Sequence, residues 1–220
     1  MALRRGPMSF FYSKNQKVRQ FVNPKTGKIN PGGNFRSFNE NWEASEADVQ
    51  TIAEATAAGD GLCAWHLLNG KRIKDSTGTI KAGLVIIDID NQADHKDEDG
   101  NKVQKQELTV EEALELDICK KYLSFAYYSP STSEGWPRFR LVFGLEHPVL
   151  DPDFYQWFVR SIAVQIPGSD RRATQAVNLF YGGKAPSDLI CTTPNYIPST
   201  KINEAFAAYS LIPKEEKLDD

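Results

Sequence analysis

The chain has 220 residues and a formal net charge of −3, with 40% hydrophobic and 25% charged residues. These values are typical of a globular domain, and no apolar run reaches the length of a membrane span. The first residues lack the apolar core of a signal peptide, so we expect a cytoplasmic location and no membrane contact. The net charge argues against a uniformly basic surface but does not exclude local basic patches.

The cysteines are three in number and widely separated: Cys63, Cys119 and Cys191. None forms a C-x-x-C pair, so the sequence predicts neither a disulfide framework nor a zinc site. We expect all three to be small core residues.

The first 80 residues predict short strands, turns and one helix. Ser45 to Asp48 has the composition of an N-cap, and apolar residues at helical spacing then predict a helix that ends at Gly59. A hairpin is expected over residues 62–73, because Asn69-Gly70 is a typical two-residue turn.

The next stretch, residues 81–198, predicts one sheet with two helices. Strands are expected at residues 84–91, 125–128, 138–143 and 176–181, and helices at 109–122 and from Asp151 to before Pro167. The sequence Thr109-Val110-Glu111-Glu112 has the S/T-x-x-E pattern of a capping box, which predicts the start of the first of these helices. This βαββαβ order indicates an α+β fold of the ferredoxin-like or RNA-recognition type, with both helices on one face and the other face free. A short strand at 189–192 and a helix at 201–209 follow, and residues 199–220 are taken as a C-terminal helix and tail.

An acidic pair closes the most apolar strand, which reads GLVIIDIDN from Gly83. Side chains alternate along a strand, so Asp88 and Asp90 leave the same face, with Cα atoms about 7 Å apart. Two carboxylates at that separation can share divalent cations. Alternatively, an aspartate at a strand end caps the turn that follows it.

Two arginines alternate with apolar residues in the strand at 138–143. If Phe139 and Leu141 pack on the helices, Arg138 and Arg140 emerge on the free face, which the acidic pair shares. Carboxylates that hold cations, beside guanidiniums that bind phosphate, suit phosphoryl or nucleotidyl transfer. The alternative is a ladder of ion pairs between arginine and aspartate on neighbouring strands.

Two further segments carry polar side chains that suit a phosphate site. The loop at residues 129–133, SPSTS, offers hydroxyl and backbone N–H donors to a triphosphate, although it is also ordinary turn composition. Asp170, after Gly168-Ser169, is a candidate third carboxylate or simply a loop residue.

Together these segments resemble a known family. GLVIIDIDN, SPSTSEGWPRFRLVF, and GSD followed by NLFYGG look like the three motifs of the archaeo-eukaryotic primase superfamily, in its primase-polymerase branch of phages, plasmids and bacterial mobile elements. The resemblance runs from about Trp42 to Pro198. It implies an RNA-recognition-like catalytic subdomain preceded by a smaller α/β subdomain at about residues 1–80. It also implies that Asp88, Asp90 and Asp170 bind two divalent metal ions, Mg²⁺ or Mn²⁺, and no zinc.

The implied function is that of a DNA primase or DNA-directed polymerase that primes replication. A 3′-hydroxyl would attack the α-phosphate of an NTP or dNTP, and pyrophosphate would leave. The expected triphosphate contacts are Ser131, Thr132, Ser133, Arg138, Arg140 and Arg72. A single-stranded or primed DNA template would contact the N-terminal subdomain and Arg171, Arg172 and Lys184. A helicase would lie on another chain or beyond Asp220.

Two positions depart from the family pattern. Thr132 stands where the middle motif has a histidine, and Asn178 stands where the third motif has an arginine. A threonine donates a hydrogen bond but carries no positive charge. Two alternatives therefore remain: a catalytically impaired module that binds nucleotide or single-stranded DNA, and a metal-dependent nuclease.

Overall fold

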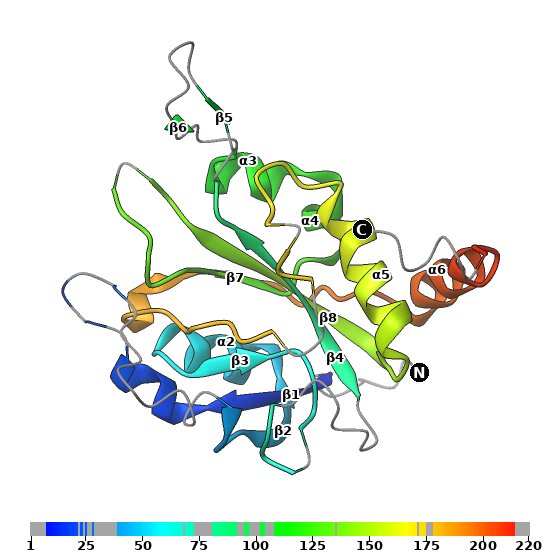
Figure 1. Ribbon diagram of the computed structural model, residues 1–220, viewed down its shortest axis with the longest axis horizontal. Helices are drawn as coiled ribbons and strands as arrows, with labels where there is room; N and C mark the ends of the chain where they lie inside the picture. Colours follow the sequence, from blue (N-terminus) through cyan, green and yellow to red (C-terminus); the bar gives the residue numbers. More distant parts are fainter. Residues whose placement is uncertain are drawn as a thin grey trace, which may run out of the picture.

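The fold is mixed α+β with antiparallel sheets, which confirms the predicted class (Figure 1). This computed structural model describes residues 8–21, 23, 25, 28, 39–67, 69–72, 81–91, 95–96, 102–103, 108–134, 136–170, 172–174 and 178–213.

A small three-stranded sheet organises the N-terminal lobe, the name used here for the described residues from 8 to 72. Its order is β2-β1-β3, with β1 (Ser9–Asn15) antiparallel to both β2 (Glu43–Asp48) and β3 (Gly61–Cys63). The 3-10 helix η1 (Gln16–Phe21) follows β1, and helix α2 (Val49–Ala57) follows β2.

The helix predicted to follow the N-cap at residues 45–48 is present as α2, which begins at Val49 and ends at Ala57, two residues before Gly59. Residues 45–48 belong to β2, and the Asp48 carboxylate caps α2 by accepting a 2.9 Å hydrogen bond from the Thr51 N–H. The expected hairpin over 62–73 was wrong for its described part; residues 68 and 73 lie outside the described residues. Residues 61–63 pair with β1 instead, and residues 65 and 66 lie beside the start of the larger sheet, where the His66 N–H donates to the Lys81 carbonyl oxygen.

The central sheet has four antiparallel strands in the order β4-β8-β7-β9. They are β4 (Ala82–Ile89), β8 (Phe139–Val149), β7 (Phe125–Tyr128) and β9 (Leu189–Thr192). The short strands β5 (His95–Lys96) and β6 (Lys102–Val103) form a separate pair, and the 3-10 helix η2 (Pro186–Asp188) precedes β9. The strands predicted at 84–91, 125–128, 138–143 and 189–192 are therefore present, and β8 continues to Val149.

Four helices accompany this sheet: α3 (Val110–Glu115), α4 (Asp117–Tyr122), α5 (Pro152–Ala163) and α6 (Ser199–Ser210). The predicted capping box is present, because the Glu112 N–H donates to the Thr109 hydroxyl and the Glu112 carboxylate accepts from the Thr109 N–H. Leu116 is extended and divides the predicted helix at 109–122 into α3 and α4. Helix α5 packs against β4, where the Tyr155 hydroxyl donates to the Leu84 carbonyl oxygen.

The strand predicted at 176–181 was wrong for its described part. Phe180 makes a single antiparallel bridge to Leu62 of the N-terminal lobe instead of joining the central sheet. A close approach explains this path, since a Cβ atom on Gly182 would lie 2.3 Å from the Thr56 carbonyl oxygen. The described part of this segment therefore packs on the end of α2 and does not add a strand to the central sheet. Residues 176 and 177 lie outside the described residues.

The sheet face expected to be free is largely covered. The register puts Asp88, Arg140 and Tyr127 side by side on this face. Farther along the same face, a Cβ atom on Gly144 would lie 2.4 Å from the Phe10 ring, so β1 packs directly on the sheet. The N-terminal lobe thus closes most of the face, and the site residues lie near one end of it.

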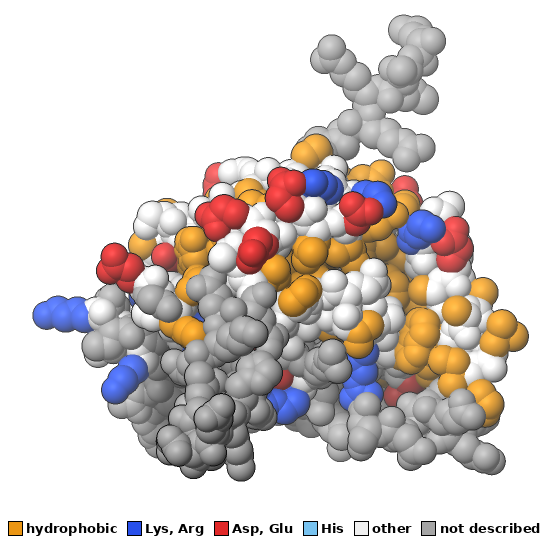
Figure 2. Space-filling model, turned by 90° about the horizontal axis from the view of Figure 1, so that it is seen from above, with side chains coloured by type: hydrophobic (Ala, Val, Ile, Leu, Met, Phe, Trp, Pro, Cys, Tyr) orange, Lys and Arg blue, Asp and Glu red, His pale blue; other side chains and the backbone are white. Residues whose placement is uncertain are grey.

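The helices of the described residues include none that could cross a membrane. Figure 2 shows hydrophobic side chains gathered toward the side where α6 lies, and Leu150 and Phe206 are among the exposed ones.

Candidate functional site: an acidic and basic cluster at the end of the central sheet

Three carboxylates from two distant segments meet at the end of β4. Asp88 lies in β4 and Asp90 is the first residue after it, and the charges of Asp88 and Asp170 both act on the Asp90 carboxyl group. Ser169 bridges Ile89, and the Asp170 N–H donates a 2.8 Å hydrogen bond to the Asp88 carbonyl oxygen. The side chains of the three acids are 22–26% exposed, so each of these side chains is still reached by solvent.

An arginine accompanies each of the three acids. Arg140 Nε lies 2.9 Å from Asp88, Arg138 Nε lies 3.1 Å from Asp90, and Arg172 Nε lies 3.2 Å from Asp170. The cross-strand register places Asp88 directly opposite Arg140. The ion-pair ladder that the sequence left open as an alternative is therefore present.

The pKa of the Asp90 carboxyl group is shifted by its surroundings. Burial raises the pKa of Asp90 above its ordinary value, the charge of Arg138 opposes the rise, and Asp88 and Asp170 add to it. The charges of Asp88 and Asp170 therefore repel the charge of Asp90, and a bound cation would relieve this repulsion.

Arg140 lies inside the molecule and not on an open face. It is 6% exposed, and its guanidinium donates to the Asp88 carboxylate, the Tyr127 hydroxyl and the Tyr181 carbonyl oxygen. Its guanidinium also lies 5.4 Å from the centroid of the Phe180 ring. We had expected this side chain to emerge beside the acids and bind phosphate; the structure instead gives it the place of a fixed counter-ion for Asp88.

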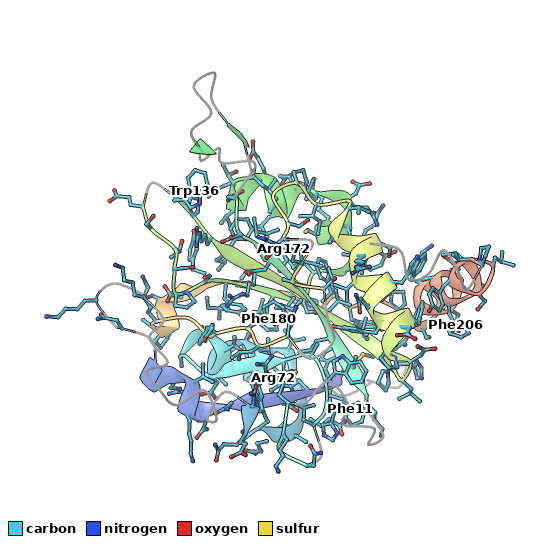
Figure 3. All side chains as sticks on the ribbon, in the orientation of Figure 1. Phe11, Arg72, Trp136, Arg172, Phe180 and Phe206 are labelled. Carbon is cyan, nitrogen blue, oxygen red and sulfur yellow. The ribbon has the colours of Figure 1, made fainter. Side chains whose placement is uncertain are left out.

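Arg72 approaches the same region from the N-terminal lobe. Its backbone N–H and its guanidinium both donate to Asn39, at 2.8 and 3.1 Å. Burial raises the pKa of the Tyr181 phenol, while the charges of Arg72 and Arg140 lower it, so both cations lie near Tyr181. Figure 3 shows Phe180 between the central sheet and the lobe, with Arg72 on the lobe side.

Hydrogen bonds hold the hydroxyl-rich segment at residues 129–133 in place. The Ser131 hydroxyl lies 2.8 Å from that of Ser129, and the Thr132 hydroxyl accepts from the Arg138 N–H. Ser133 is exposed and pairs through its backbone with Trp136. The indole of Trp136 donates to the Asp90 carbonyl oxygen, so the loop lies against the acidic strand.

The predicted template contacts are only partly described. Arg172 is 83% exposed in its side chain, Lys184 is exposed, and Arg171 lies outside the described residues.

Asn91 is a site residue whose role sequence reasoning missed. It is fully buried, and its side chain donates to the carbonyl oxygens of Leu108 and Pro137 and accepts from the Leu108 N–H. Its backbone N–H donates to Gly168, and its φ of 50° is a conformation that asparagine tolerates. One side chain thus ties the acidic strand to the starts of α3 and β8. An asparagine directly after D-x-D was the available signal.

The donor chemistry of the site suits a hard divalent cation. Three carboxylate groups are the oxygen ligands that Mg²⁺ and Mn²⁺ prefer, whereas structural zinc sites use sulfur and nitrogen. Across the part of the chain that the structure describes, no three acidic, histidine or cysteine side chains stand in a metal-holding arrangement. Asp88, Asp90 and Asp170 each lie against an arginine. A cation at this site would compete with those arginines.

Comparisons of the chain with family models, curated proteins and solved structures found no match.

Proposed function

We propose that the chain is a primase-polymerase that transfers nucleotides to a primer in a template-directed reaction. The observation that carries the proposal is the meeting of Asp88, Asp90 and Asp170 beside cations at the end of one sheet. The three motifs that resemble the archaeo-eukaryotic primases supply these residues. An RNA-recognition-like catalytic subdomain is part of the proposal, although the sixth element of that order does not join the sheet.

The residues divide into three roles. The three carboxylates would hold Mg²⁺ or Mn²⁺, which lowers the pKa of an attacking 3′-hydroxyl and offsets charge on the triphosphate. We assign Arg138, Arg72 and the loop at 131–133 as donors for phosphate oxygens. Arg140 holds Asp88 in place, which fixes one carboxylate before any ligand binds.

The direct test is primer extension. Purified protein is incubated with a primed DNA template, labelled dNTPs and Mn²⁺, and products are resolved on a denaturing gel. The expected result is extension that stops when a chelator is added. If no extension occurs with all dNTPs and NTPs and with either metal, the proposal that the chain is a polymerase is contradicted.

A module that binds without catalysis is the second candidate. Thr132 and Asn178 replace the family histidine and arginine, and the Thr132 hydroxyl is already used as an acceptor for the Arg138 N–H. Such a module would retain single-stranded DNA or nucleotide in a binding assay and give no product in the extension assay.

A further inference from the structure

Two arginines at the start of β8 are held very differently. Arg140 makes a well-directed hydrogen bond to Asp88 and two more to Tyr127 and Tyr181. Arg138 lies 3.1 Å from the Asp90 carboxylate, but its Nε–H does not point at that oxygen, so the contact is an ion pair without a hydrogen bond. The side chain of Arg138 is 20% exposed, compared with 7% for Arg140. Arg140 is therefore fixed, and Arg138 is loosely held.

The backbone around Arg138 is nevertheless rigid. Its N–H donates to the Thr132 hydroxyl, and its carbonyl oxygen accepts from the Ser129 N–H. The side chain can therefore change direction while its Cα atom stays in place. Among the described residues, Asp90 is the partner of its guanidinium.

Asp90 depends on a counter-ion because most of its side chain is removed from solvent. The side chain is only 26% exposed, and Arg138 is the cation that lies against it, at 3.1 Å. Removing Arg138 from Asp90 without replacement would leave this charge uncompensated. A cation must take over before the arginine can leave.

We propose that Arg138 is an exchangeable counter-ion: it neutralises Asp90 in the ligand-free protein and turns to the triphosphate of the incoming nucleotide once a divalent ion is bound. This inference rests on the proposed function and deepens it. It makes nucleotide binding depend on metal binding, because the same guanidinium serves Asp90 first and phosphate afterwards.

The exchange predicts opposite effects of one substitution on two ligands. In Arg138→Gln, a competing positive charge is lost, so Mn²⁺ binding in the absence of nucleotide should become about 5- to 20-fold tighter. Binding of dATP in saturating Mn²⁺ should become at least about 10-fold weaker, because a charge-assisted contact to phosphate is lost. Mn²⁺ binding is measured by electron paramagnetic resonance and dATP binding by calorimetry, both without primer or template.

Two controls accompany the variant. Arg138→Lys keeps the charge, so its Mn²⁺ affinity should stay within about 2-fold of the parent protein. Lys201→Gln removes one positive charge from α6, which lies away from the acids, and should change neither affinity. Circular dichroism and thermal unfolding establish that each variant folds.

The outcomes separate the inference from the proposed function. Tighter Mn²⁺ binding with weaker dATP binding supports the exchange. Unchanged or weaker Mn²⁺ binding by Arg138→Gln, with a parent protein that binds Mn²⁺, overturns the exchange and leaves the proposed function standing. Failure of both proteins to bind Mn²⁺ overturns both.

Discussion

The N–H of Asp170 donates a 2.8 Å hydrogen bond to the carbonyl oxygen of Asp88, which joins two segments that lie far apart in the sequence. This bond, with the bridge from Ser169 to Ile89, brings the third carboxylate to the first two. It uses only backbone atoms. The carboxylates can therefore be altered singly without breaking the connection that assembles them.

The two strand carboxylates should respond differently to removal. Asp90→Asn should abolish extension and Mn²⁺ binding while changing the free energy of unfolding by less than about 1 kcal/mol, because its partner Arg138 is partly exposed. Asp88→Asn should abolish extension and Mn²⁺ binding. It should also lower the free energy of unfolding by about 3 kcal/mol, because the buried Arg140 guanidinium loses its negatively charged partner.

Urea unfolding and extension assays on both variants test this difference. Equal loss of stability in the two variants would contradict the distinction between a fixed and an exchangeable arginine. Extension by a folded Asp90→Asn protein would remove that residue from the site.

Asn91 should be essential for the integrity of the site. Asn91→Asp keeps the size and the tolerance of a positive φ, but it replaces the two N–H donors to Leu108 and Pro137 with a buried carboxylate. The expected cost is about 2–4 kcal/mol of unfolding free energy. Asn69→Asp is the matched control, since Asn69 is exposed and its side chain, among the described residues, only accepts a hydrogen bond, from the Lys71 N–H.

Chemical denaturation of the two variants, compared with the parent chain, measures this effect. Should Asn91→Asp unfold with the same free energy as Asn69→Asp, the asparagine does not hold the three segments together.

Local patterns in the sequence were sufficient for several elements. The apolar run that ends on Asp88 predicted β4, and the S/T-x-x-E signature predicted Thr109 as the N-cap of α3. These features depend on residues close in the sequence. For Asp170, its position in the sequence left two alternatives open, a third carboxylate or a loop residue, because no local pattern relates residues so far apart. The motif resemblance favoured the first.

Long-range packing explains the errors. Phe180 lies in a β-like run, yet the close approach of Gly182 to α2 directs it toward the N-terminal lobe. The expectation that Arg140 faces solvent assumed an uncovered sheet, whereas Phe180 lies over its guanidinium. Whether a charged side chain binds a ligand or fixes a neighbour depends on which segment covers it, and no periodicity encodes that.

Gly182 should couple the N-terminal lobe to the site. A Cβ atom there would lie 2.3 Å from the Thr56 and 2.5 Å from the Asp60 carbonyl oxygens, both backbone atoms. Gly182→Ala should therefore cost about 1–3 kcal/mol of stability. It should also speed amide exchange of Phe180, whose N–H donates to the Leu62 carbonyl oxygen at 2.9 Å.

The control for this change is Gly61→Ala. The nearest atoms to a Cβ atom there belong to the Val18 side chain, at 3.0 and 3.2 Å, and they can shift more readily than backbone. Hydrogen exchange followed by mass spectrometry distinguishes the two. Unaltered protection of Phe180 in Gly182→Ala would mean that the lobe adjusts without releasing the bridge.

The cysteine thiols should be unreactive in the folded protein. Burial raises the pKa of Cys63 to about 11 and that of Cys119 to about 12, and Cys191 is shifted in the same direction. At pH 8 only about one Cys63 side chain in a thousand is then a thiolate, compared with about a quarter of ordinary thiols. Iodoacetamide at pH 8 should therefore modify the native chain far more slowly than the chain unfolded in guanidinium.

The same raised pKa values predict that the protein becomes less stable at high pH. The folded state holds these protons at pH values where the unfolded state has released them, so the free energy of unfolding should fall as pH rises above about 8.5. Cys63→Ala should show a shallower decline between pH 8 and 10 than the parent protein, measured by urea unfolding at each pH. Parallel declines would show that other groups, such as buried tyrosines, account for the whole pH dependence.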